Sequence, residues 1–276
     1  DAEGYISRYE HDGAGRKSAD IHINPEGADQ ITRYEYDTLG RCHRVTQGLG
    51  DEAYVTIKEY DFLDRVLEER TETLEGDVQH WVEYAYDAAG NRTMVAEHAA
   101  NGVAITLTAY DARNRVTMVT DALGNSTVTQ YQDGYVDSRG QRVQRTIVTD
   151  PLGRRTISIM DPLGNIAREE ILDAYGTMVS KKECRYDAVG NLLACQTTVI
   201  APGREERLVV NEWRYGPMKR LLAIIEAEGT PEQRTIRFEY DQWGQKSAVV
   251  KGDGQRVEYC YDVVGRLSEY FSEDRA

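Results

Sequence analysis

The chain has 276 residues, 40% of them hydrophobic, and a formal net charge of −14 at pH 7. A chain this acidic is expected to repel phosphate backbones, so we expect no nucleic-acid partner. Its longest uninterrupted apolar run, Leu221 to Ile225, has five residues and is far too short to predict a membrane span.

A six-residue phrase, Tyr-Asp-x-x-Gly-Arg/Asn, recurs along the whole chain and is clearest at Tyr36–Arg41, Tyr86–Asn91, Tyr186–Asn191 and Tyr261–Arg266. Such a repeat predicts an array of like units rather than a compact enzyme. No stretch of the chain lacks it, so we expect a single repeat region over residues 1–276. The phrase or a relative of it starts at fourteen positions: Asp12, Asp37, Asp61, Asp87, Asp111, Asp121, Asp137, Asp150, Asp161, Asp173, Asp187, Gly216, Asp241 and Asp262.

The chemistry of the phrase is that of a tight chain reversal. Its Asp accepts a hydrogen bond from a nearby backbone N–H, and its Gly supplies the positive φ that closes a type I turn with a bulge. Asp64 and Asn114 replace that Gly and tolerate the same left-handed backbone. Tyr215–Arg220 is the poorest copy, with Lys219 at the Gly position. The residues that we assign to these turns in the four clearest copies are Asp37, Gly40, Arg41, Asp87, Gly90, Asn91, Asp187, Gly190, Asn191, Asp262, Gly265 and Arg266.

The sequences that flank the turns predict β-strands. Residues 82–86, 236–240 and 257–261 alternate apolar with polar side chains. Residues 221–228 are the best candidate for a helix, but the turn before them favours a strand. The predicted fold class is therefore all-β: an array of hairpins in one spiralling or curved sheet. With 18 Tyr against 3 Phe, one face of that sheet is expected to border a large polar interior.

The spacing of the phrases divides the chain into three parts. The phrases stand 21 to 29 residues apart in the outer parts and 10 to 16 apart from Asp111 to Asp187. This pattern predicts long hairpins over residues 1–110 and 187–276 and short ones over 111–187.

Three sets of residues raise the question of catalysis or ligand binding. Asp150 and Asp161, each followed by Pro, resemble a pair of carboxylates for acid–base chemistry, but the repeat makes two ordinary turn residues the better interpretation. The Arg at the end of a phrase could line a ligand site; stacking on a Tyr or pairing with a turn carboxylate is the favoured role. The histidines at 11, 22, 43, 80 and 98 lack the spacing of metal ligands. We expect no catalytic residue, no metal and no cofactor.

The cysteines and tryptophans remain. Cys184 and Cys195 flank one predicted turn and could face each other across a hairpin. Free thiols in a protein made in a reducing cytoplasm are nevertheless the expectation for all four cysteines, which include Cys42 and Cys260. Trp81, Trp213 and Trp243 are tentative sugar-stacking residues.

The repeated Tyr-Asp-x-x-Gly-Arg resembles the Rhs (rearrangement hotspot) or YD-repeat family over essentially the whole chain. The resemblance implies a β-sheet ribbon wound into a hollow shell. Bacterial members are polymorphic toxins whose shell encloses a C-terminal toxic domain, and animal relatives act in cell adhesion. Bacterial shells also carry an aspartyl autoprotease with Asp-Pro-x-Gly-Leu motifs. Here Arg154 and Asn165 stand at the Leu positions of the two Asp-Pro copies, a departure from that motif.

We therefore expect a structural shell segment whose partners are the rest of the shell and an encapsulated toxin domain. The start, Asp1-Ala2-Glu3-Gly4, is no secretory signal, and the repeat begins and stops without caps, so we expect a piece of a longer protein. Cytoplasmic synthesis followed by secretion or delivery through a bacterial secretion system fits this role. The alternatives are an extracellular carbohydrate-binding or adhesion module, self-association, and a segment that contributes an aspartyl autoprotease.

Overall fold

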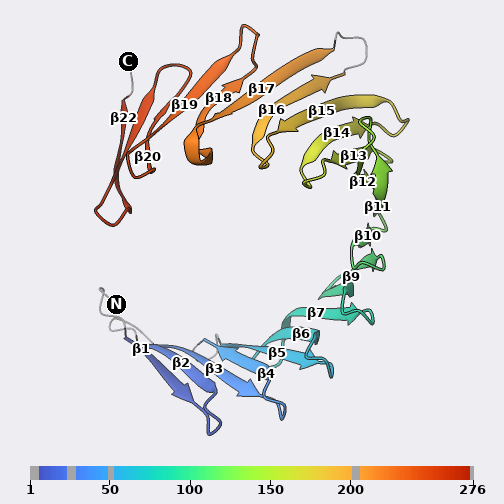
Figure 1. Cartoon of the computed structure of the whole chain (residues 1–276). Helices are drawn as coiled ribbons and strands as arrows, with labels where there is room; N and C mark the ends of the chain where they lie inside the picture. The colour runs from blue at the N-terminus through green and yellow to red at the C-terminus, as the bar shows by residue number, and fades with distance from the viewer. Residues whose placement is uncertain (1–5, 24–28, 49–52, 201–205, 274–276) are drawn as a thin grey trace. The chain divides into compact units, whose positions relative to one another are not determined.

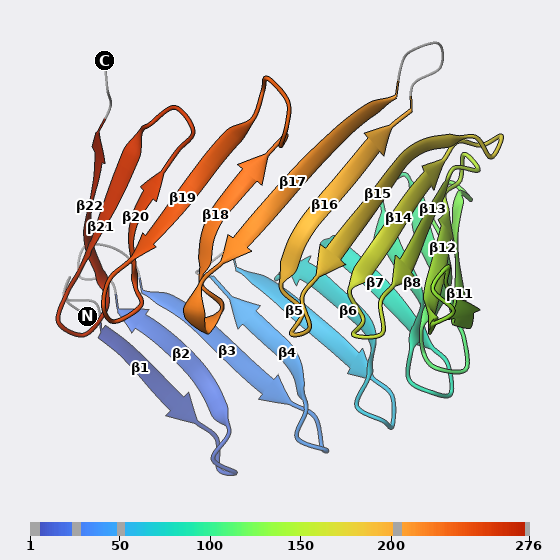
Figure 2. The same ribbon diagram turned by 45° about the horizontal axis from the view of Figure 1, so that its top comes forward.

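The computed structural model describes residues 6–23, 29–48, 53–200 and 206–273 (Figure 1). The chain divides into two units, Asp1–Thr127 and Val128–Ala276, which are described separately. In both units each strand pairs antiparallel with the next strand along the chain (Figure 2).

The first unit contains ten strands joined as successive hairpins. Its strands are β1 (Ile6–His11), β2 (Lys17–Ile23), β3 (Gln30–Tyr36), β4 (Cys42–Gln47), β5 (Tyr54–Tyr60), β6 (Val66–Thr73), β7 (Val78–Tyr86), β8 (Arg92–Ala99), β9 (Gly102–Tyr110) and β10 (Val116–Thr120).

The second unit continues in the same way, except that β11 already starts two residues before its boundary. Its strands are β11 (Ser126–Val136), β12 (Arg142–Thr149), β13 (Arg155–Met160), β14 (Ile166–Leu172), β15 (Met178–Tyr186), β16 (Leu192–Val199), β17 (Arg207–Tyr215), β18 (Leu221–Glu226), β19 (Arg234–Tyr240), β20 (Lys246–Val250), β21 (Arg256–Tyr261) and β22 (Leu267–Glu273). One 3₁₀ turn, η2 (Pro217–Lys219), joins β17 to β18.

The all-β hairpin array predicted from the sequence is confirmed. Residues 221–226 form strand β18, as the turn before them indicated. Within the described ranges η2 is the one helical element, and none of those residues forms a helix long and apolar enough to cross a membrane.

Few side chains are fully buried. The described residues include twelve buried hydrophobic ones, most of them small, such as Ala19, Val55, Ala194 and Ala248. Most other strand residues are half-buried or exposed on both faces of the sheet. Because few side chains are buried, the sheet depends more on the backbone hydrogen bonds between strands and on the side-chain contacts at the strand ends.

The alternating hairpins give each unit two edges. We call the edge with the turns after odd-numbered strands the first edge, and the opposite one the second edge. The first edge carries the phrases at Asp12, Asp37, Asp61, Asp87 and Asp111 in the first unit, and those at Asp137, Asp161, Asp187, Gly216, Asp241 and Asp262 in the second. The second edge carries the other three, at Asp121, Asp150 and Asp173.

This arrangement corrects the expectation of short hairpins over 111–187. Strands β12 to β15 contain 6 to 9 residues and strands β5 to β8 contain 7 to 9. The phrases are close together in the middle of the chain because both edges carry them there, whereas elsewhere only the first edge carries them. Their spacing therefore reports which edges carry the phrase, and not hairpin length.

Candidate functional site: the clamps that join the hairpins

The turn of each phrase is closed by its Asp. At Asp61 the backbone N–H donates to the carbonyl of Arg65, and one side-chain oxygen accepts from the N–H groups of Leu63 and Arg65 at 2.8 and 3.0 Å. The same pattern holds at the other Asp-led phrases, for example at Asp37. Gly40 and Gly90 have φ near +90°, and Asp64 and Asn114, at that position, have φ of 61° and 59°. The Asp is thus fully used by its own turn.

Where an Arg or Asn follows the Gly position of an Asp-led phrase, its side chain occupies the second carboxylate oxygen of that Asp. Arg65 donates from Nε to Asp61 Oδ2 at 2.7 Å, and Asn91 donates to Asp87 Oδ2 at 2.9 Å. Arginine and asparagine alternate at this place because both present an N–H at the required distance. Arg41, Asn191 and Arg266 make the same contact in their turns.

In the first unit Arg41, Arg65 and Asn91 also reach the next turn on the first edge. The guanidinium of Arg41 donates to the carbonyl of Asp61 at 2.6 Å and lies 4.9 Å from the centre of the Tyr60 ring. Arg65 contacts Asp87 and Tyr86 in the same way, at 3.2 Å and 4.6 Å. One arginine therefore joins two successive hairpins through a charge-assisted hydrogen bond and a cation–π contact.

The tyrosine of the phrase closes the gap between hairpins. The ladder between two hairpins stops before it reaches the first edge, and the Tyr hydroxyl donates to the carbonyl two residues beyond the last pair. Between β6 and β7 the last pair is Glu68 with Glu83, and Tyr86 donates to Val66. Seven such hydrogen bonds span 2.7 to 3.1 Å: Tyr36 to Lys17, Tyr60 to Cys42, Tyr86 to Val66, Tyr110 to Arg92, Tyr186 to Ile166, Tyr240 to Leu221 and Tyr261 to Lys246.

We call this combination of turn Asp, following Arg or Asn, and bridging Tyr a clamp. Its electrostatics favour the ionised form of the carboxylate. Hydrogen bonds from the Arg115 side chain and backbone lower the pKa of Asp111, and the Asn91 amide lowers that of Asp87. At Asp61 burial raises the pKa, but the hydrogen bonds from Arg65 outweigh it, so the pKa again lies below its ordinary value. A general acid or base near neutral pH needs the opposite shift.

The structure separates Asp150 from Asp161. Asp150 closes the turn between β12 and β13, and Asp161 closes the turn between β13 and β14, so the two lie at opposite edges of the sheet. Strand β13, six residues long, runs between them and spans about 20 Å. Burial raises the pKa of both carboxyls, yet hydrogen bonds from Arg154 and Asn165 lower both overall. These two residues do not form an aspartyl dyad.

The three tryptophans lie in different surroundings. Trp81, on β7, stacks on His98 with ring centres 3.6 Å apart, so one face of its ring is covered. Trp243 stands at the tip of the Asp241 turn and is largely exposed. Trp213, on β17, lines an open groove of about 600 Å³ together with Tyr215 and Asn191. Trp81 belongs to the first unit, and within the second unit Trp213 lies in a strand whereas Trp243 lies at a turn tip.

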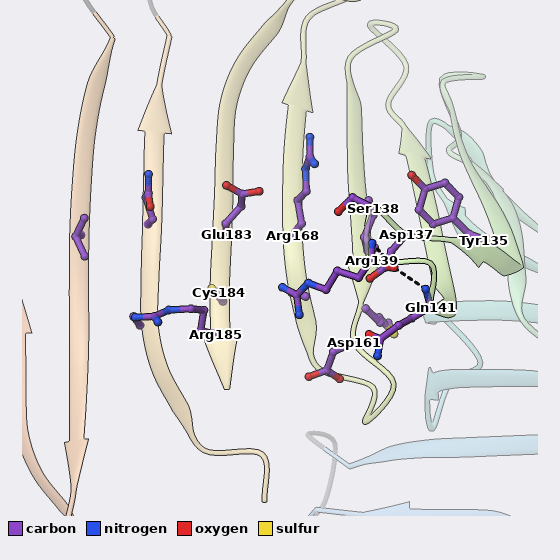
Figure 3. Close-up of a pocket in the computed structure, with 16 residues that line it drawn as sticks. Tyr135, Asp137, Ser138, Arg139, Gln141, Asp161, Arg168, Glu183, Cys184 and Arg185 are labelled. Atoms are coloured by element: carbon purple, nitrogen blue, oxygen red, sulfur yellow. Dashed lines mark hydrogen bonds between the residues drawn. The ribbon is translucent and has the colours of Figure 1, made fainter. Parts of the chain in front are cut away.

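The second unit also holds a cavity of about 400 Å³ beside the Asp137 turn (Figure 3). Its charged lining residues are Asp137, Asp161, Glu183, Arg139, Arg168 and Arg185. Acidic and basic groups are equal in number, so the cavity does not present a site of one charge for an ionic ligand. Within the described part of the chain, no three His, Cys, Asp or Glu side chains gather as metal ligands.

Cys184 and Cys195 form a disulfide, contrary to the expectation of four free thiols. They are direct partners in the register of β15 and β16, with Cα atoms 4.2 Å apart, and both are buried. The prediction of free thiols was wrong because it was based on the reducing conditions of the cytoplasm. The positions of the two cysteines on either side of one turn already allowed them to face each other. Cys42 and Cys260 are free, and burial raises the pKa of the Cys42 thiol.

Two clamp-like turns lie outside the fourteen phrases. The backbone N–H groups of Thr73 and Lys251 donate to the carbonyls of Asp77 and Gln255, and glycines 76 and 254 have φ near +90°. In the first of these turns the Thr73 hydroxyl accepts from the Asp77 N–H in place of an Asp carboxylate. In the sequence these turns are marked only by a Gly three residues after Thr73 and Lys251. A Gly alone is too common to identify a turn without the Asp.

Comparisons with known proteins place the chain beside toxin structures. The Photorhabdus luminescens Tc holotoxin pore with a TccC3 mutation is 15% identical, with a TM-score of 0.39, and the match covers 99% of this chain and 16% of that one. The TcdB2-TccC3-Cdc42 structure is 14% identical, with a TM-score of 0.35, and the match covers 97% of this chain and 19% of that one. The TcdB2-TccC3 structure is 14% identical, with a TM-score of 0.30, and the match covers 97% of this chain and 20% of that one. This chain thus spans a fifth or less of each of these three solved chains. No protein-family model and no curated protein matches it.

Proposed function

We propose that this chain is a wall segment of an Rhs-type shell, that it has no catalytic role, and that the shell encloses a toxic cargo C-terminal to residue 276. The observation that carries the proposal is the complete structural use of the phrase. The Asp closes the turn, and the following Arg or Asn holds that Asp. Arg41, Arg65 and Asn91 also reach the next turn, and the Tyr closes the ladder between hairpins.

A wall built in this way can extend without a thick core. Each hairpin covers the edge of its neighbour, so the array grows by adding hairpins rather than by enlarging an interior. A thin sheet with few buried side chains suits the wall of a shell, because the wall encloses a space that its own side chains do not fill. The disulfide between Cys184 and Cys195 favours an oxidising destination, which agrees with export after synthesis in the cytoplasm.

Protease protection in the longer polypeptide tests the enclosure. Its sequence C-terminal to residue 276 is compared with the same sequence expressed alone, under limited proteolysis followed by mass spectrometry. We expect that sequence to be cleaved much more slowly within the longer polypeptide, which we call the parent, than when it is expressed alone. Equal cleavage of the two forms would rule out an enclosed cargo.

A second experiment tests the absence of catalysis in this segment. Asp150→Asn with Asp161→Asn is introduced into the parent, which is then incubated and examined for self-cleavage. Because both carboxylates close turns at opposite edges, we expect the fragment pattern of the parent to stay unchanged. Loss of a fragment in a variant that is still folded would assign an activity to these residues.

The groove beside Trp213 favours carbohydrate binding as a second candidate. Trp213 and Tyr215 offer two aromatic surfaces and Lys219 lines the same groove, a combination suited to stacking and hydrogen bonding of a sugar. A glycan array tests it, with Trp213→Ala expected to abolish any signal and Trp81→Ala as the control outside the groove. An array without binding removes this candidate.

A further inference from the structure

The phrase at Asp137 departs from the clamp at three positions. Val136 occupies the position of the bridging Tyr, and Gln141 occupies that of the Arg or Asn after the Gly. The third residue of the phrase is Arg139, although this residue is apolar in most of the other copies. Asp137 still closes its turn, because one carboxylate oxygen accepts from the N–H groups of Arg139 and Gln141 at 2.9 and 2.8 Å. This copy therefore keeps the turn but not the residues that join a turn to its neighbours.

The side chains of this hairpin border a cavity instead. The cavity of about 400 Å³ is lined by the end of the hairpin and by strands β13 to β17 (Figure 3). The hairpin contributes four residues to the lining: Tyr135, Ser138, Arg139 and Gln141. A space of this size can hold a small organic ligand. Two of the departures from the phrase, Arg139 and Gln141, thus line a space of ligand size.

The acidic groups of the cavity are largely engaged within the protein. Both carboxylate oxygens of Asp161 accept hydrogen bonds from Asn165, one from its backbone N–H and one from its amide. Glu183 pairs with the ammonium group of Lys181 at 2.8 Å. Asp137 uses one of its two oxygens to close its turn. Little of the capacity of these carboxylates to accept hydrogen bonds is left for a ligand.

The basic groups of the cavity are less engaged. The side chains of Arg139 and Arg185 are exposed, and among the described residues neither guanidinium has a hydrogen-bond or ion-pair partner. Arg168 pairs with Glu170, yet its Nε atom is buried and lacks a partner within the same described ranges. The equal numbers of acidic and basic groups balance the charge at long range, but the hydrogen-bonding capacity that remains is mostly that of guanidinium donors.

This combination indicates the chemistry of a ligand. A guanidinium group presents its N–H donors in a fixed planar fork, which matches the oxygens of a carboxylate or a phosphate. Because the overall charge of the lining is balanced, such a ligand would be recognised by direct hydrogen bonds rather than by long-range attraction. We propose that the cavity binds a small molecule that carries a carboxylate or phosphate group, held by Arg139 and Arg185. This site does not depend on an enclosed cargo.

Modification of arginines by phenylglyoxal tests the site in the full chain. Mass spectrometry follows the reaction at each arginine, with inorganic phosphate or acetate added and with sodium chloride keeping the ionic strength constant. We expect at least one of the two anions to slow the modification of Arg139 and Arg185. Arg234 and Arg237, exposed on β19 outside the cavity, are the controls and should react at an unchanged rate.

The two anions distinguish the two kinds of ligand. Protection by phosphate alone assigns a phosphate group to the ligand, and protection by acetate alone assigns a carboxylate. Absence of protection by either anion, or equal protection of all four arginines, overturns the proposal.

Paired variants separate a site from a general effect of charge. Arg139→Gln with Arg185→Gln and Arg234→Gln with Arg237→Gln each remove two positive charges from the second unit. Isothermal titration calorimetry with the protecting anion is expected to show binding at least about tenfold weaker in the first variant and unchanged in the second. Circular dichroism confirms that both variants are folded. Equal weakening in the two variants would show that net charge alone controls binding, and the site would be rejected.

Discussion

The hydroxyl of Tyr86 donates a hydrogen bond of 2.8 Å to the carbonyl of Val66, on the neighbouring hairpin. This contact lies just beyond Glu68 and Glu83, where the backbone ladder between β6 and β7 ends. The tyrosine side chain thus satisfies a carbonyl that the sheet itself leaves without a backbone donor. Because the same contact returns at seven hairpin junctions, it explains why the phrase combines a tyrosine with a turn.

Replacing the turn glycine should cost stability in proportion to backbone strain. Gly164 has φ +88°, and a Cβ added there meets nothing within 4 Å, so Gly164→Ala isolates the strain of the left-handed backbone. We expect Gly164→Ala to lower the free energy of unfolding by about 1–3 kcal/mol, and Gly164→Asn to cost less. Urea denaturation followed by circular dichroism measures both.

Gly134 provides the matched control for that substitution. Its φ lies outside the left-handed range, and its Cβ position is equally open. Gly134→Ala is expected to be neutral or slightly stabilising. Equal losses at Gly134 and Gly164 would show that the positive φ is not what the phrase requires.

The disulfide should be detectable without a structure. In denatured, unreduced protein an alkylating reagent is expected to modify Cys42 and Cys260 and to spare Cys184 and Cys195. The bridge closes a short loop, with a sequence separation of 11, so Cys184→Ser with Cys195→Ser should destabilise β15 and β16 by about 2–3 kcal/mol. Mass spectrometry that finds four modified cysteines would contradict the bridge.

Acid should loosen the clamps. The folded pKa values of Asp61, Asp87 and Asp111 lie below the unfolded value of about 3.9. A lowered pKa contributes stability that is complete above about pH 4 and is lost as the pH falls through the folded value. The melting temperature is therefore expected to fall steeply between about pH 4 and pH 2.

High salt is the control for the pH experiment. Protonation also relieves the repulsion among the excess negative charges, an effect that would raise stability and that salt screens. In concentrated salt the acid-induced decrease should persist. A melting temperature that does not change or rises on acidification in salt would mean that the turn carboxylates do not stabilise the fold.

The sequence was sufficient to predict the hairpin array because the phrase is a local signal. Asp, Gly and their spacing determine a turn within six residues, and even Asp64 and Asn114 at the Gly position have the left-handed backbone expected of them. The copy at Gly216 forms a turn as well, with Lys219 in left-handed geometry.

What could not be predicted depends on relations between hairpins. The acceptor of each Tyr hydroxyl lies 15 to 20 residues earlier in the chain, and no local pattern marks it. Spacing alone likewise could not tell turns on two edges from short hairpins on one. Only the order of the strands shows that Asp150 and Asp161 lie at opposite edges.

Hydrogen exchange of paired tyrosine variants tests most directly whether the phrase is a structural clamp. Tyr60→Phe and Tyr86→Phe remove hydroxyls that bridge hairpins. Tyr54→Phe and Tyr84→Phe are the controls on the same strands, at positions where no hydrogen bond of the hydroxyl is found within the described residues. We predict that each bridging variant loses about 1 kcal/mol of local stability, with faster exchange at the first-edge ends of β4–β5 and β6–β7, while the controls match wild type. Indistinguishable exchange in the two sets would contradict the clamp.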